Sequence, residues 1–280
     1  MEGKPPLVSV VIPCYNYGQY VEEAIDSVLQ STWTDLEIIV VNDGSTDPDT
    51  KAVLHQLRKP KTTIIHQANK GLPAARNAGI RMARGTYILP LDADDKIHPR
   101  YVEQAVKILK THPRIGFVTC WVKRFGDSHG IWRCKPYNFY RQLFANNVAV
   151  ASLFRKTAWK QAGGYNENMK RGYEDWDFWI SLGKKGWHGY TIPQPLFFYR
   201  KHGPSMITES VKIHHQLVRQ IRANHPELYT PRMLRRLRKI WLQSGCAKLR
   251  PITRRKPART RRRTGIVRAV RRKGRGKRRA

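Results

Sequence analysis

The sequence predicts an α/β fold built on a doubly wound, mostly parallel sheet. Short apolar runs alternate with segments of helical periodicity over the first 115 residues, and the connections between them are brief. Polar residues also follow three of the four apolar runs directly, at the strand ends where such a sheet binds its ligand. A chain of 280 residues is long enough to bury the core of a fold of this class.

Four strands are expected in the first half of the chain. Each is a short run of apolar and β-branched residues, which is typical of strands that are buried on both faces of a parallel sheet. These runs cover residues 8–13, 36–41, 62–65 and 86–89.

Helices are expected between these strands. Apolar residues recur at helical spacing in 21–29 and 102–109, and an alanine-rich helix is expected over 72–83. Asp47 followed by Pro48 is a typical helix start, because the carboxylate can cap the first turn and proline fits there without losing a hydrogen bond.

The second half of the chain has a less regular pattern. A strand is expected over 115–125, an irregular aromatic segment over 136–147, and a helix from Glu174 through Leu182. Helices are also expected in 206–250.

Positive charge is concentrated at the C-terminal end. The net charge is +33, and 22 of the 53 Lys and Arg residues but none of the 20 Asp and Glu residues lie in 231–280. Because Arg, Lys, Pro and Gly dominate 251–280, we expect a disordered basic tail there. The tail favours an anionic membrane surface as partner; it has no aromatic residue to stack on bases, which makes nucleic acid the weaker alternative.

Several classes of protein are excluded or disfavoured. No apolar run reaches the ~20 residues that span a bilayer, and the first strand begins too early to leave room for a signal peptide. We therefore expect a cytoplasmic protein, peripheral on the cytosolic face of a membrane if the tail binds there. Without C-x-x-C, G-x-G-x-x-G or G-x-x-x-x-G-K-[ST], a zinc ribbon, a dinucleotide-dependent dehydrogenase and a P-loop nucleotidase are all disfavoured.

Two carboxylates follow the fourth predicted strand. Asp92 and Asp94 are separated only by Ala93, and such a pair could hold a divalent cation that in turn grips phosphate oxygens. A solvated turn or a helix cap would use the same residue types.

Five motifs in a fixed order extend this interpretation. The segments VSVVIPCYN, VVNDGSTD, NKGLPAARN, LDADD and EDWD begin at Val8, Val40, Asn69, Leu91 and Glu174. Together they resemble the family 2 glycosyltransferases, which have the GT-A fold with a Rossmann-like nucleotide-binding half. The resemblance runs from about residue 8 to residue 202.

The resemblance implies an enzyme that transfers a sugar with inversion from a nucleotide-sugar, usually a UDP-sugar. The acceptor would be a glycan, a lipid-linked molecule or a protein, as in the synthesis of cell-envelope polysaccharide. A hexosyl- or N-acetylhexosaminyltransferase that uses Mn²⁺ or Mg²⁺ is therefore expected. By the same resemblance, the nucleotide-sugar would contact Pro13, Tyr15, Asn16, Asp43, Lys70, Arg76, Asn77, Asp92 and Ala93.

The resemblance also assigns the metal ligands and the catalytic base. Asp94 would ligate the metal, Asp92 would assist, and His202 is a candidate third ligand that could equally be an ordinary surface or core histidine. Asp175 matches the family's base, a group that inverting transfer needs to take the acceptor proton. It could also be a helix cap beside Trp176.

The expected organisation is a glycosyltransferase domain over 1–205, a helical extension over 206–250 and the tail over 251–280. Within the domain, 1–115 would bind the nucleotide-sugar and 116–205 the acceptor. The second half has no family signature of its own, so the donor sugar, the acceptor and the linkage stay open. Two other functions are alternatives: a nucleic-acid-binding protein that uses the tail, and a sugar-nucleotide pyrophosphorylase, for which the N-terminal Gly-rich loop is missing.

Overall fold

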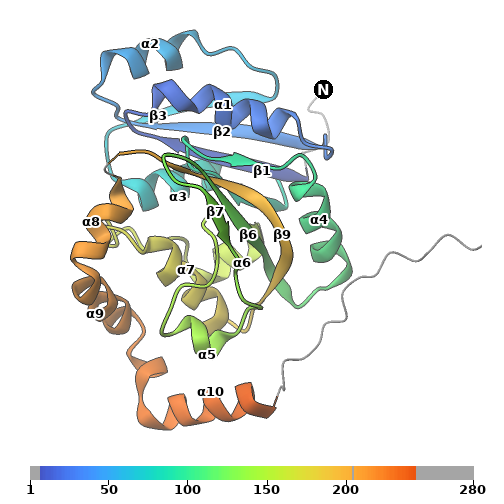
Figure 1. Cartoon of the computed structure of the whole chain (residues 1–280), viewed down its shortest axis with the longest axis vertical. Coiled ribbons are helices and arrows are strands. Elements are labelled where there is room, and N and C mark those ends of the chain that lie inside the picture. The colour runs from blue at the N-terminus through green and yellow to red at the C-terminus, as the bar shows by residue number, and fades with distance from the viewer. Residues whose placement is uncertain (1–6, 204, 244–280) are drawn as a thin grey trace, which may run out of the picture. The chain divides into compact units, whose positions relative to one another are not determined.

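The computed structural model describes residues 7–203 and 205–243, in which nine strands form one sheet with helices on both faces (Figure 1). The strands are β1 (Val8–Cys14), β2 (Leu36–Asp43), β3 (Thr62–Gln67), β4 (Tyr87–Pro90), β5 (Lys96–Ile97), β6 (Ile115–Gly126), β7 (Gly130–Trp132), β8 (Leu153–Arg155) and β9 (His188–Lys201). The helices are α1 (Gly18–Leu29), α2 (Pro48–Gln56), α3 (Leu72–Met82), α4 (Tyr101–Thr111), α5 (Phe139–Gln142), α6 (Lys156–Ala162), α7 (Glu174–Lys184), α8 (Met206–Lys212), α9 (His214–Asn224), η1 (Pro226–Tyr229) and α10 (Pro231–Gln243).

The strand order is β3-β2-β1-β4-β8-β6-β9-β5, with β7 paired to β6. The first four strands along the chain are mutually parallel, and β9 is parallel to β6. The antiparallel ladders, such as β4 with β8, extend over only two or three residue pairs, so most of the pairing is parallel. This confirms the predicted fold class, and the four strands predicted in the first half are all present.

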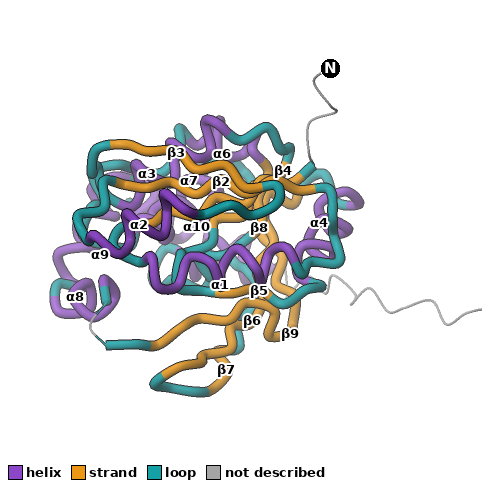
Figure 2. The backbone as a smooth tube through the Cα atoms, turned by 90° about the horizontal axis from the view of Figure 1, so that it is seen from above, coloured by secondary structure: helices purple, strands orange, loops and turns teal. Residues whose placement is uncertain are grey.

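Alternate residues of the central strands face two separate layers of core. Val10 and Ile12 of β1 pack with α1 and α4, whereas Val11 packs with α3 and α7. This alternation follows from the two-residue period of a strand and explains why every residue of β1 is buried. Figure 1 shows α1 above β2 and α3 below it, and Figure 2 gives the same elements seen from above.

The C-terminal helices pack against the same body. Leu217 and Ile221 of α9 join Trp176 and Ile180 of α7 in a third apolar cluster. The described residues up to 243 consequently form one compact unit, and the predicted division at residue 205 stays a prediction. The predicted tail, 251–280, lies outside the described residues.

The structure adds several short elements that the sequence pattern did not reveal. β5, β7 and β8 have two or three residues each, and α5 lies within the segment that was expected to be irregular. Elements of this length carry no periodic signal, because their partners rather than their own residues define them. None of the described helices is long and apolar enough to cross a membrane.

Candidate active site

The polar loops that follow β1, β2 and β4 lie at the same edge of the sheet. β1 is parallel to both of its neighbours, with Cys14 opposite Asn42 and Val11 opposite Pro90, so the carboxyl ends of the three strands are adjacent. This is the edge at which open α/β sheets bind ligands. The sequence predicted this placement.

Asn16 connects the first two of these loops. Its backbone has a φ of 58°, a left-handed conformation that asparagine tolerates better than most residues. Its Oδ1 accepts hydrogen bonds from the backbone N–H groups of Thr46 (2.8 Å) and Asp47 (3.0 Å). Pro13 is buried, whereas Tyr15 is 42% exposed and accessible to a ligand.

Asp43 is held in place at the end of β2. Its carboxylate accepts hydrogen bonds from Gln67 Nε2 (2.6 Å) and from the backbone N–H groups of Lys70 (3.0 Å) and Gly71 (2.9 Å). The side chain of Lys70 itself is exposed. Asp43 thus fixes the chain as it enters α3, which positions the residues of that helix.

Arg76 connects the loop after β4 to the start of α7. The side chain is completely buried, and its guanidinium pairs with Asp92 Oδ1 (2.6 Å) and with Glu174. Burial opposes its charge, but the two carboxylates outweigh that effect and raise the pKa of Arg76. The structure therefore brings Asp92 and the Glu174 motif together around one buried cation.

Asn77, the next residue along α3, has a different environment. Its Oδ1 accepts from Trp159 Nε1 (3.1 Å) and from the Tyr165 backbone N–H (2.9 Å), and its Nδ2 donates to the Tyr165 carbonyl and to Glu167. It also lines a cavity of about 560 Å³ that none of the other predicted site residues lines. Among the described residues, no polar contact joins Asn77 to the loops that carry Asp43 and Asp92, so its donor-binding role stays a prediction.

Asp94 contacts His202, the residue that directly follows β9. Asp94 Oδ2 lies 2.8 Å from His202 Nε2, and Arg200 Nε donates to the Asp94 carbonyl at 2.8 Å. The pKa of Asp94 is raised, mainly because the carboxyl group is buried and also because of the nearby charge of Asp92. Ala93, between the two aspartates in sequence, is buried.

The pair Asp94 and His202 could hold a divalent cation. A carboxylate oxygen and an imidazole nitrogen are acceptable to Mn²⁺, and the nearby Asp92 adds further negative charge. Within 7–203 and 205–243, no group of three or more His, Cys, Asp and Glu side chains has a metal-binding arrangement. The protein would supply only part of the coordination shell, which fits a cation shared with the phosphates of a substrate.

Asp175 is the second residue of α7. Its Oδ1 accepts the backbone N–H of Trp176 (2.7 Å), and its Oδ2 accepts Asn146 Nδ2 (2.9 Å). Burial, together with the charge of Glu174, raises the pKa of Asp175 to about 7. A carboxylate with this pKa could take up a proton near neutral pH, as a general base must. The helix-cap alternative holds only in part, since the residue at the cap position is Tyr173.

The sequence did not reveal the residues that hold Asp175. Asn146 Oδ1 accepts a hydrogen bond from Gln142 Nε2 (3.0 Å), and the carbonyl of Gln142 accepts one from Trp176 Nε1 (2.6 Å). Together with the two hydrogen bonds to Asp175, these contacts form a ring of hydrogen-bonded residues that includes the carboxylate. No pattern in the sequence indicates it, because 29 residues separate Asn146 from Asp175.

Comparison with known proteins gives these residues a context. The model of the family "Glycosyl transferase family 2" matches residues 9–166. A chondroitin synthase of Escherichia coli is 34% identical over 188 residues, which are 65% of this chain and 27% of that protein. This chain therefore spans little more than a quarter of that relative's length.

Solved structures show the same fold. Staphylococcus aureus TarS in complex with UDP-GlcNAc has a TM-score of 0.66 and 18% identity, over 80% of this chain and 67% of that one. The mannosyltransferase PcManGT of Pyrobaculum calidifontis, in complex with GDP-Man and Mn²⁺, has a TM-score of 0.56 and 19% identity, over 88% and 76% of the two chains. Likeness at this identity concerns the fold alone. With a family match over more than half of its residues, this chain belongs to glycosyl transferase family 2.

Proposed function

We propose that the protein is an inverting glycosyltransferase that moves a sugar from a nucleotide-sugar to a glycan, lipid-linked or protein acceptor. The observation that carries the proposal is Asp175, a carboxylate with a raised pKa that two hydrogen bonds hold beside the Arg76 network. That network ties it to Asp92 in the loop predicted to bind the donor. In this proposal, residues 1–115 bind the donor and residues 116–205 bind the acceptor. The reaction takes place in the cytoplasm.

The donor is proposed to be a UDP-sugar that carries a hexose or an N-acetylhexosamine. In support, the chondroitin synthase is a relative and TarS is complexed with UDP-GlcNAc. The nucleotide would lie at the sheet edge over Tyr15 and the loop fixed by Asp43, where a ring is exposed and backbone groups are held in place. GDP-Man, the donor bound to PcManGT, is the second donor to test.

A divalent cation, Mn²⁺ or Mg²⁺, is proposed to bind at Asp94 and His202 with support from Asp92. When bound, it would neutralise the charge that develops on the departing diphosphate. The carboxylate and imidazole are already within hydrogen-bond distance of one another, and PcManGT contains Mn²⁺.

The chain's own part in the reaction is to hold the acceptor and move one proton. Asp175 would take the proton from the acceptor hydroxyl as that oxygen forms its bond to the anomeric carbon. The bond from that carbon to the diphosphate breaks on the opposite side, which inverts the configuration. Asn146 would keep the carboxylate oriented through this step, since it donates to Oδ2 and leaves the second lone pair of that oxygen free.

The test separates binding from chemistry. Asp175→Asn keeps the shape of the side chain and removes its basicity, so turnover of a UDP-sugar should fall by roughly 10²–10⁴ while UDP affinity stays within a few-fold. The matched control is Asp49→Asn, on the exposed face of α2, which should change neither. Equal losses of affinity and turnover in Asp175→Asn would refute its role as the base.

A further inference from the structure

α10 has two chemically distinct faces. Met233, Leu234 and Leu237 pack against the third apolar cluster, and Trp241 stacks on Tyr140 of α5 with the ring centroids 5.6 Å apart. The apolar face of this amphipathic helix is therefore occupied by the protein itself. What remains available to a partner is the opposite face.

The opposite face is cationic and carries no neutralising charge. Arg232, Arg235, Arg236 and Lys239 follow the spacing i, i+3, i+4 and i+7, lie on one side of the helix and are all exposed. None of the four takes part in an ion pair within the described part of the chain. Glu227, the last acidic residue of the sequence, pairs with Lys184 instead.

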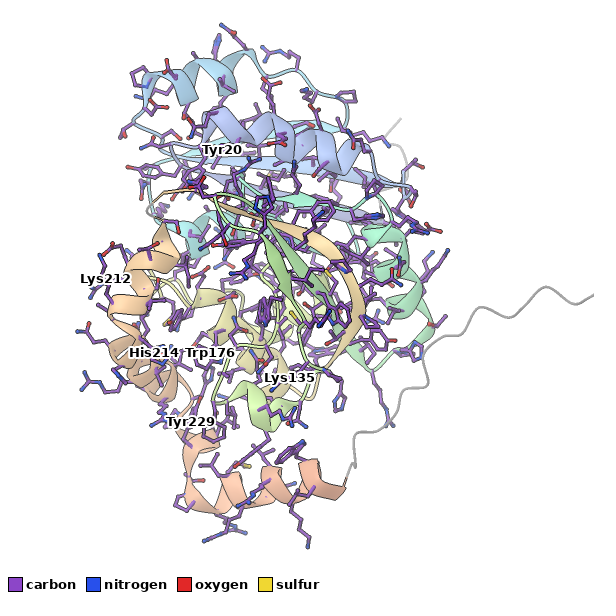
Figure 3. The ribbon with its side chains drawn as sticks, viewed as in Figure 1. Tyr20, Lys135, Trp176, Lys212, His214 and Tyr229 are labelled. Carbon is purple, nitrogen blue, oxygen red and sulfur yellow. The ribbon has the colours of Figure 1, made fainter. Side chains whose placement is uncertain are left out.

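Apolar residues flank this cationic face on both edges. Ile240 is 51% exposed and Leu242 is 63% exposed, and the helical period places them on opposite sides of the four cations. In Figure 3, side chains that end in nitrogen extend from α10 away from the rest of the molecule. The face thus combines several unpaired positive charges with aliphatic side chains at its margins.

We propose that this face of α10 docks the protein onto an anionic lipid surface. Each Lys or Arg near such a surface adds to the electrostatic attraction, so four together can hold a protein of this size on a membrane. Ile240 and Leu242 favour lipid over nucleic acid, because acyl chains bury aliphatic side chains whereas a phosphate backbone offers them nothing. Because the apolar face is occupied, the helix adsorbs on the headgroups and does not insert along its length.

α5 contacts both α10 and the residue that holds the candidate base, Asp175. α5 carries Tyr140, on which Trp241 stacks, and also Gln142, which holds Asn146 against Asp175. If the proposed function is correct, a lipid-linked acceptor is the acceptor class that this arrangement favours. The membrane docking itself does not depend on catalysis and is tested without donor or acceptor.

The experiment is vesicle co-sedimentation of the full chain at ~0.1 M salt, where charges within about 10 Å of the surface still interact. Vesicles of phosphatidylcholine alone are compared with vesicles that also contain phosphatidylglycerol. The variant Arg235→Gln/Arg236→Gln/Lys239→Gln should lower partitioning onto the anionic vesicles about tenfold or more. The matched control Lys51→Gln/Arg114→Gln/Lys160→Gln removes the same charge from exposed positions outside α10 and should lower this partitioning less than about twofold.

A second variant tests the class of partner. Ile240→Ser/Leu242→Ser should weaken vesicle binding by several-fold and leave the binding of a single-stranded oligonucleotide unchanged. Equal effects of the two charge variants would overturn the proposal, since binding would then depend on net charge and not on α10. Failure to bind anionic vesicles, with salt-sensitive binding to the oligonucleotide instead, would also overturn it.

Discussion

The proposed donor half, residues 1–115, and the proposed acceptor half, residues 116–205, build their parts of the candidate site in different ways. In the donor half, parallel strands deliver Asp43 and Asp92 to one edge because successive strands of this type end on the same side. In the acceptor half, Asp175 and His202 reach that edge from a helix and from the end of a 14-residue strand. Local topology therefore places the first pair, and long-range contacts place the second.

The contacts that cross between the halves are the ones that assemble the site. Arg76 reaches Glu174, and Asp94 reaches His202, over 98 and 108 residues of sequence. If the site depends on these crossing contacts, removing them should cost more than perturbing the interior of either half.

The largest effect is expected at the crossing from Asp94 to His202. Asp94→Ala should lower the rate of UDP-sugar turnover by roughly 10²–10⁴, because the departing diphosphate would lose the cation proposed to stabilise it. EDTA should abolish the wild-type activity and Mn²⁺ should restore it, whereas Mn²⁺ should not rescue the variant. Full activity of the variant in chelator would show that no metal acts at this position.

The second crossing contact should govern stability. Arg76→Met leaves Glu174, with a side chain only 6% exposed, without its cation, so the free energy of unfolding should fall by about 3–5 kcal/mol. Arg76→Lys keeps the charge but lacks the planar guanidinium that pairs with two carboxylates. Its free energy of unfolding should fall by less than that of Arg76→Met. Urea unfolding followed by tryptophan fluorescence measures both. A midpoint unchanged in Arg76→Met would mean that the halves are held together elsewhere.

A change inside the donor half should have a smaller effect. At Gly79 in α3, an added Cβ would overlap Val11 Cγ1 and lie 2.9 Å from Val41 Cγ2. Gly79→Ala should therefore destabilise the protein by about 1–2 kcal/mol, since overpacking outweighs the gain in helix propensity. Thermal unfolding tests this, and a raised melting temperature would contradict the close packing of α3 on the sheet.

The smallest effect is expected inside the acceptor half. The transfer rate should rise with pH through about 7, because the proposed base, Asp175, would have to be ionised to take a proton and its pKa is raised to about 7. The hydrogen bond from Asn146 favours the charged form, so Asn146→Leu should move the midpoint of this pH profile upward by about one unit. Asn147→Ala, in the same loop but without a contact to Asp175, serves as the control and should leave the midpoint in place.

Much of the fold and part of the site could be predicted from local pattern. The strand over 8–13 and the helix after Asp47 were recognisable because their residues themselves specify burial on both faces and a capped first turn. β8 and α5 were missed, since a strand of three residues and a helix of four are stabilised by their neighbours. For the same reason the Asn146 contact to Asp175 has no counterpart in the sequence pattern.

The sequence by itself determined the α/β class, the sheet edge that carries the polar loops and the residue types available for chemistry. Tertiary structure alone decided that Arg76 lies between two carboxylates and that Asp94 faces His202. It also decided that α10 turns its cations outward, because its apolar face packs on α5 and η1. The physical reason is that periodicity encodes which face of an element is buried, whereas the identity of the partner on that face follows only once the whole chain has packed.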